Sequence, residues 1–187
     1  MMKPLTQALR ALFVVVVIGS VLFPAITYLI GDTVFHDSAN GSVLRKEQAV
    51  IGSQLIGQYN DHPTYFWPRP SMGGYQPKRA SASNFPYMSD AYKMAINERY
   101  KAVRQAHPDV TGNIPIDIIT SSASGLDPHI SPEAAMLQVG RISKARKLDA
   151  AALQALVDQH TEEKQWGIFG ARRVNVLLLN IALDEVN

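Results

Sequence analysis

The chain has 187 residues, of which 47% are hydrophobic and 18% charged, and this composition is typical of a globular domain. The absence of cysteine excludes disulfide bonds and thiolate metal ligands. Two of the 18 basic residues, Lys3 and Arg10, precede a long apolar run, which leaves 16 basic residues against 16 acidic ones and disfavours nucleic-acid binding.

The first predicted element is a membrane-spanning helix at 11–30, a run of 20 residues without charge. As an α-helix the run would extend about 30 Å, which matches the hydrocarbon core of a bilayer. Because basic residues precede it and acidic residues follow, we expect 1–10 in the cytoplasm and the rest outside. The alternative is a cleaved signal peptide, but its apolar region is usually only about 7–15 residues long.

Small residues and a proline within this run suit close packing against another membrane helix, namely Gly19, Ser20 and Pro24. A short polar linker is predicted at 31–41, and an extracytoplasmic domain of mixed strands and helices (an α/β fold) at 42–187. Within that domain, the apolar runs 42–44 and 49–51 flank four polar residues and predict a β-hairpin.

The segment 65–71 concentrates aromatic residues and prolines around a single arginine, Arg69. Its prolines favour an extended backbone. We expect an edge strand whose Tyr65 and Phe66 fill the core, whereas Arg69 fits a binding surface and a structural position equally well.

Helical spacing predicts one helix that begins after Ser89 and ends before Pro108, and another that begins after Asp149. The apolar residues of 174–183 alternate, which favours a buried strand without excluding a helix. These elements together indicate the mixed α/β domain.

The central stretch 115–142 predicts a strand, a tight loop and a capped helix in succession. Its β-branched run 116–120 favours a strand. The small residues of 121–125 favour a tight loop. Ser131 as N-cap and Pro132 at the first helical position then predict a helix.

Motifs for zinc proteases, P-loops, dinucleotide binding and serine hydrolases do not occur, so we expect neither a catalytic residue nor a metal site. Asp127, His129 and Ser131 alternate along the chain, but the members of a catalytic triad must converge in space. The alternatives are a membrane-anchored hydrolase using Ser124 or Ser131 with His129, and a membrane-anchored module that binds a ligand or peptide.

Several stretches together resemble the KdpC family, the accessory chain of the Kdp-type bacterial potassium-transporting P-type ATPase, over nearly the whole sequence. They are the N-terminal membrane helix, 51–58, 65–66, 69–71, 124–132, 134–135, 138–141, 174–177 and 179–180. The segment 81–86 departs from the glycine-rich loop that is usual in this family.

The resemblance implies a non-catalytic accessory subunit of an ATP-driven, high-affinity potassium uptake complex in the bacterial inner membrane. The implied partners are a channel-like potassium-translocating subunit, a P-type ATPase subunit and a further, very small membrane subunit. The family is also described as a catalytic chaperone that raises the ATP affinity of the ATPase subunit, and Gln138 matches the glutamine implicated.

A domain outside the membrane cannot reach cytoplasmic ATP, so any effect on ATP affinity would have to pass through the ATPase subunit. We therefore expect no firmly bound cofactor, and ATP contact stays a family-implied possibility. From the residues alone, Gln138 is a polar position on an amphipathic helix. The candidate docking face combines two motifs, Arg69, Pro70 and Ser71 with Ser124, Gly125, Leu126, Asp127, Pro128 and His129.

Overall fold

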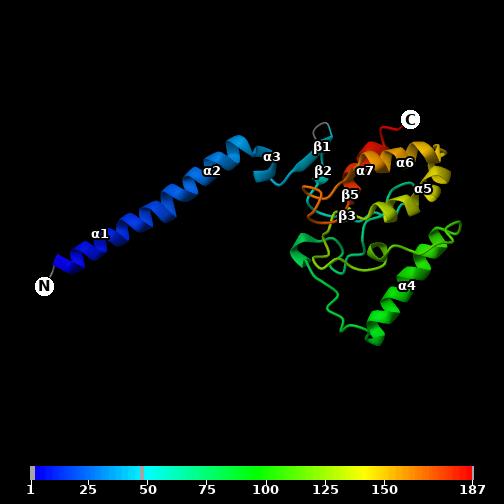
Figure 1. Ribbon diagram of the computed structural model, residues 1–187, viewed down its shortest axis with the longest axis horizontal. Coiled ribbons are helices and arrows are strands. Elements are labelled where there is room, and N and C mark those ends of the chain that lie inside the picture. Colours follow the sequence, from blue (N-terminus) through cyan, green and yellow to red (C-terminus); the bar gives the residue numbers. More distant parts are fainter. Residues whose placement is uncertain (1–2, 47–48, 187) are drawn as a thin grey trace. The chain divides into compact units, whose positions relative to one another are not determined.

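The structure, a computed structural model, describes residues 3–46 and 49–186 (Figure 1). It divides into two compact units, Met1–Ser53 and Gln54–Asn187. The predicted division into 1–10, 11–30, 31–41 and 42–187 stays a prediction.

The first unit begins with α1 (Lys3–Val17), a π-helical turn (Ile18–Leu22) and α2 (Phe23–Val34). They form one continuous helix of 32 residues, and among the described residues it is the one helix long and apolar enough to cross a membrane. The predicted span 11–30 lies within it. The helix also includes four residues of the predicted linker, and α3 (His36–Ala39) follows directly.

The π-helical turn lies where the sequence places Pro24. Proline has no backbone N–H, so it cannot bond the carbonyl of Ser20 in the ordinary helical pattern. The N–H of Phe23 donates to the carbonyl of Ile18, which is the wider π-helical spacing. Gly19 and Ser20 lie inside this turn, and Pro24 lies in the first turn of α2 directly after it.

The predicted hairpin is confirmed. Strand β1 (Val43–Lys46) pairs antiparallel with β2 (Ala49–Ser53), with a register shift between Leu44 and Arg45, and the connecting residues 47–48 lie outside the described ranges. Ser53 Oγ donates to the carbonyl of Gly41 at 2.6 Å, so the hairpin ends beside the point at which it began.

The second unit combines helices with a small sheet, as the sequence predicted. Its sheet has the order β3 (His129–Ile130), β5 (Arg173–Asn175), β4 (Thr161–Glu162), and every pairing is antiparallel. Its helices are α4 (Asp90–Ala106), α5 (Pro132–Arg146), α6 (Ala150–Gln159) and α7 (Val176–Leu183), with short 3-10 turns at Pro77–Arg79 and Ile116–Ile118.

Helix α5 is the centre of this unit. It packs against α6, which in turn packs against α7, in the yellow-to-red part of Figure 1. Ala134, Ala135 and Ile142 of α5 are fully buried, and so are Leu153 and Val157 of α6. Burial of these apolar side chains is the main driving force that holds the helices together.

The three predicted helix starts are confirmed, because a side chain accepts a backbone N–H at each. Ser89 accepts from Tyr92 N at 3.2 Å. Ser131 accepts from Ala134 N at 3.1 Å, and Asp149 accepts from Ala152 N at 3.3 Å.

Three strand predictions were wrong. The run 116–120 begins with the 3-10 turn Ile116–Ile118, and its Ile118 and Ile119 are buried in the core without joining a sheet. The run 174–183 is a strand only to Asn175, whose side chain accepts the N–H groups of Leu177 and Leu178 and begins α7. The segment 65–71 is extended but belongs to neither sheet.

Candidate functional site

Side-chain amides from two helices hold the extended segment 65–69 in place of a neighbouring strand. Gln138 of α5 accepts from Trp67 N at 2.7 Å and donates to Trp67 O at 3.2 Å. Asn180 of α7 accepts from Phe66 N at 2.8 Å and donates to Phe66 O at 3.0 Å. Each amide thus satisfies both backbone groups of one residue, which explains an extended segment outside any sheet. We call Gln138 and Asn180 the amide clamp.

Two arginines of α5 complete the attachment of this segment. Arg141 donates to the carbonyls of Pro63 and Tyr65, and its guanidinium lies 4.1 Å from the centroid of the Trp67 ring. Arg146 donates to Thr64 O at 2.8 Å and lies over the Tyr65 ring. Burial lowers the pKa of Arg141 to about 10, so its charge persists at neutral pH.

The prediction of core positions in this segment is partly confirmed. Phe66 is fully buried, and Tyr65 is half-buried against the core. Gln138 differs from the sequence interpretation, because it is fully buried instead of lying on the polar face of a helix. Its nitrogen and oxygen are engaged with Trp67, Ala134 and Arg141.

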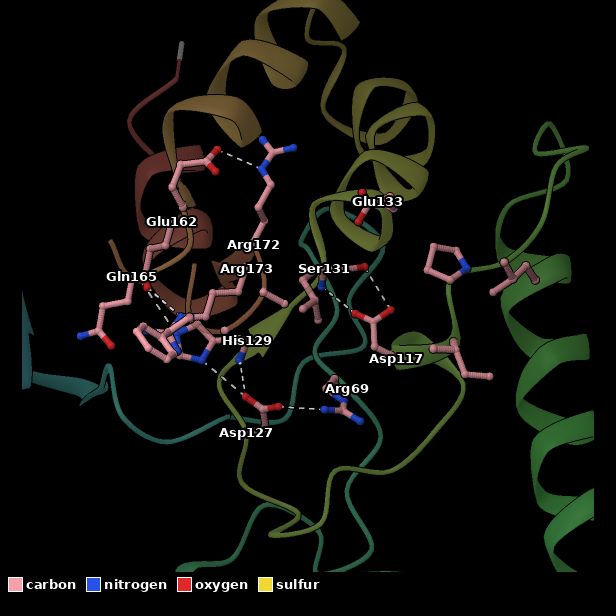
Figure 2. Close-up of a pocket in the computed structure, with 18 of the residues that line it drawn as sticks. Arg69, Asp117, Asp127, His129, Ser131, Glu133, Glu162, Gln165, Arg172 and Arg173 are labelled. Atoms are coloured by element: carbon pink, nitrogen blue, oxygen red, sulfur yellow. Dashed lines mark hydrogen bonds and ion pairs between the residues drawn. The ribbon is translucent and has the colours of Figure 1, made fainter. Parts of the chain in front are cut away.

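Beyond the amide clamp, the same segment places Arg69 in the lining of a cleft of about 960 Å³ (Figure 2). Arg69 Nη1 donates to Asp127 Oδ2 at 2.9 Å. The other carboxylate oxygen of Asp127 accepts the backbone N–H of His129 at 3.0 Å and lies 3.5 Å from its ring Nδ1. The structure therefore joins Arg69, Asp127 and His129, which the sequence separates into two motifs.

Asp127 is ionised under all ordinary conditions. Burial alone would raise the pKa of its carboxyl, but the hydrogen bonds from His129 and Arg69 outweigh burial and lower that pKa to about 2. Its side chain is 30% exposed, so the ion pair with Arg69 is accessible from the cleft and is only partly screened by water.

The sheet extends this row of ionisable side chains across the cleft. Strand β5 lies between β3 and β4, and His129 Nε2 on β3 comes within 3.9 Å of Glu162 on β4. Glu162 in turn accepts from Arg173 Nε at 2.8 Å, and Glu163 accepts from Arg172 Nε at 2.9 Å. Figure 2 shows Glu162, Arg172 and Arg173 on the same side of the cleft. Asp127, Glu162 and Glu163 are thus each paired with an arginine.

Ser131 belongs to a separate arrangement. Its hydroxyl caps α5 and donates to Asp117 Oδ1 at 3.1 Å, while its N–H donates to Asp117 Oδ2 at 2.6 Å. Among the described residues, no hydrogen bond joins Ser131 or Ser124 to His129. The alternating Asp127, His129 and Ser131 therefore lie along one chain segment without the geometry of a nucleophile and its base.

Close backbone approaches fix the loop that carries Asp127. The N–H of Gly57 donates to Leu126 O at 2.8 Å, and a Cβ on Gly57 would lie only 2.5 Å from Asp127 O. The N–H of Ser81 donates to Ser124 O at 2.9 Å. Gly125 adopts a positive φ of 69° beside Ser71 Oγ, a conformation that favours glycine.

The two predicted docking motifs therefore form one region of the second unit. Ser122 N donates to Pro70 O at 3.4 Å, Ser71 Oγ accepts from Tyr75 N at 2.9 Å, and Pro128 O accepts from Val176 N at 2.9 Å. Gly19, Ser20 and Pro24 belong to the other unit, and Gln138 lies beneath the segment that carries Arg69.

Sequence reasoning missed the loop 164–170, which borders the same cleft. Gln165 and Phe169 line the cleft, and Trp166 is 84% exposed. The signal was present, because Gln165–Ala171 is an uncharged and partly aromatic run between Lys164 and Arg172.

Comparison with known proteins gives a consistent result. Residues 5–185 match the family described as KdpC: K+-transporting ATPase, c chain. A potassium-transporting ATPase KdpC subunit of Paraburkholderia xenovorans is 46% identical over 99% of this chain and 98% of its own length. The corresponding subunits of Dechloromonas aromatica and Geobacter sulfurreducens are 45% identical (100% of both chains) and 43% identical (99% of both).

Proposed function

The chain belongs to the KdpC family, the c chain of K+-transporting ATPases, and on that premise we propose that it is a non-catalytic accessory subunit that stabilises the assembled pump. The helix Lys3–Val34 would anchor it in the bacterial inner membrane with the N-terminus in the cytoplasm. Its proposed partners are the channel-like potassium-translocating subunit, the P-type ATPase subunit and the very small membrane subunit.

The row Arg69–Asp127–His129 is the observation that carries the docking proposal. These side chains are held by the Arg69–Asp127 ion pair and the hydrogen bond from His129 N to Asp127, are partly exposed, and line a cleft next to exposed aromatic residues. A preorganised charged surface of this kind loses little side-chain entropy when a partner binds. It also discriminates between partners through charge complementarity.

We further propose that any effect on the ATP affinity of the ATPase subunit passes through protein contacts. The burial of Gln138 supports this route, because the donor and acceptor groups of its amide are already engaged within the domain. Gln138 would then act by holding the segment that presents Arg69. A two-state contact with the ATPase subunit would carry the coupling.

A charge-swapped ion pair tests the docking face. The double variant Arg69→Asp with Asp127→Arg retains an internal ion pair but reverses the order of charge in the cleft. We expect the tagged variant to be expressed and folded but to lose recovery of the channel-like and ATPase subunits from mild-detergent extracts of native membranes. Growth at limiting potassium should fall in parallel.

The matched control swaps an exposed ion pair elsewhere on the domain, Lys144→Asp with Asp109→Lys. This control should recover both partner subunits as the wild type does. Recovery of both by the Arg69/Asp127 swap would refute the docking face. If the wild-type chain itself recovers neither partner, the assembly role is wrong.

A further inference from the structure

The loop Gln165–Phe169 presents three large apolar side chains to solvent. Trp166 is 84% exposed, Ile168 75% and Phe169 59%. The Trp166 and Phe169 rings contact each other edge to face, with centroids 6.0 Å apart. A contiguous group of large apolar side chains on a soluble surface usually marks a contact with a membrane, another protein or a ligand.

Hydrogen bonds between its own backbone groups give the loop a defined conformation. Gln165 and Phe169 exchange both of their backbone hydrogen bonds, at 2.9 and 3.0 Å. Gly167 N donates to Lys164 O at 2.9 Å, and Gly167 has a φ of 75°, which suits a tight turn. Because these backbone groups are already paired, the loop can enter an apolar environment with a smaller desolvation cost.

The tip of the loop is uncharged as well as apolar. The seven residues Gln165–Ala171 carry no charge. Arg172 and Arg173 at the base of the loop are paired with Glu163 and Glu162, while Lys164 on the other side of the loop adds one positive charge. Attraction of the loop by an apolar phase would therefore depend mainly on burial, with a small salt-dependent contribution from Lys164.

Few residues of the chain separate the base of the loop from the membrane helix. In the first unit, Ser53 Oγ donates a hydrogen bond to the carbonyl of Gly41. Only the short α3 lies between the membrane helix and Gly41. In the second unit, Gln54 O accepts from Asn175 Nδ2 at 2.7 Å. Phe169 precedes Asn175 by six residues, a separation of at most about 21 Å along an extended chain.

We propose that the loop Gln165–Phe169 inserts Trp166, Ile168 and Phe169 into the outer interface of the lipid bilayer as a second membrane contact. Tryptophan prefers this interface, where its ring is apolar and its N–H stays near water. The absence of charge at the tip predicts binding to zwitterionic phosphatidylcholine without an anionic headgroup. The contact would restrict the orientation of the second unit on its single anchor.

Tryptophan quenching in bilayers tests the proposal, since Trp67 and Trp166 are the two tryptophans of the chain. The full-length chain would be reconstituted alone into phosphatidylcholine liposomes that contain lipids brominated either near the headgroup or near the end of the acyl chain. We expect most of the Trp166 intensity to be lost, with stronger quenching by the shallow bromines. The variant Trp166→Phe should show little quenching, because Trp67 is packed against Arg141.

A relocated tryptophan provides the matched control. Tyr87 is 87% exposed and lies far along the chain from this loop, so Tyr87→Trp in the Trp166→Phe background should remain unquenched. Equal quenching of wild type and Trp166→Phe would overturn the proposal. A Trp166 that is unquenched in the lone chain but becomes blue-shifted in the assembled complex would instead assign the loop to a protein partner. Because this test uses the chain alone, its result is independent of whether the complex assembles.

Discussion

Replacing Gln138 with leucine should destabilise the second unit by removing half of the amide clamp. Leucine has nearly the volume of glutamine, so the packing of α5 is retained while the N–H and C=O of Trp67 lose their partners. An unsatisfied buried polar group costs about 1–3 kcal/mol. Because Trp67 is only half-buried, water satisfies part of this loss, and we expect a decrease of about 2–3 kcal/mol in the free energy of unfolding.

Urea unfolding of the full-length chain in mild detergent would measure this change through Trp67 fluorescence in a Trp166→Phe background. The matched control is Gln154→Leu on the exposed side of α6, which should change stability by less than about 0.5 kcal/mol. If Gln138→Leu were as mild as Gln154→Leu, the hydrogen bonds of Gln138 would contribute nothing to stability. The structural explanation for Gln138 would then be wrong.

Two further substitutions test the loop that carries the ion pair. The pKa of Asp127 is lowered from 3.8 to about 2, so its contribution is present above pH 4 and is lost as the pH falls towards 2. Asp127→Asn should therefore lower the unfolding free energy by about 1–2 kcal/mol at pH 7 but hardly at all at pH 2, and equal losses at both would contradict this reasoning. Gly57→Ala places a Cβ against Asp127 O and should cost about 1–3 kcal/mol in thermal unfolding, whereas Gly140→Ala, with open space around it, should not destabilise.

Local chemistry made the helix starts predictable from the sequence. Ser89, Ser131 and Asp149 each have a side-chain acceptor next to an apolar period of 3.6 residues, and the bonds involved span only three residues. The same reasoning failed for 174–183, since a short apolar run is compatible with a strand or a buried helix. The deciding contact was the side chain of Asn175, which caps α7.

The site was predictable only in its parts. The sequence indicated Arg69, Asp127 and His129 as candidates, and the structure brings them together across a separation of 58 residues. The amide clamp could not be predicted from the sequence, because nothing in the residues around Gln138 distinguishes it from an exposed glutamine. Its partner Trp67 is 71 residues away, and only the packed fold brings them into contact.

The π-helical turn in the membrane helix gives the two halves of the anchor different orientations. One extra residue in a turn rotates every following side chain by about 100° relative to a regular α-helix. The stripe of side chains that faces a given neighbour before Ile18 is therefore displaced around the helix after Leu22. The helix thus offers one face before the turn and a second, differently directed face after it, so one helix can contact two neighbours at different positions along its length.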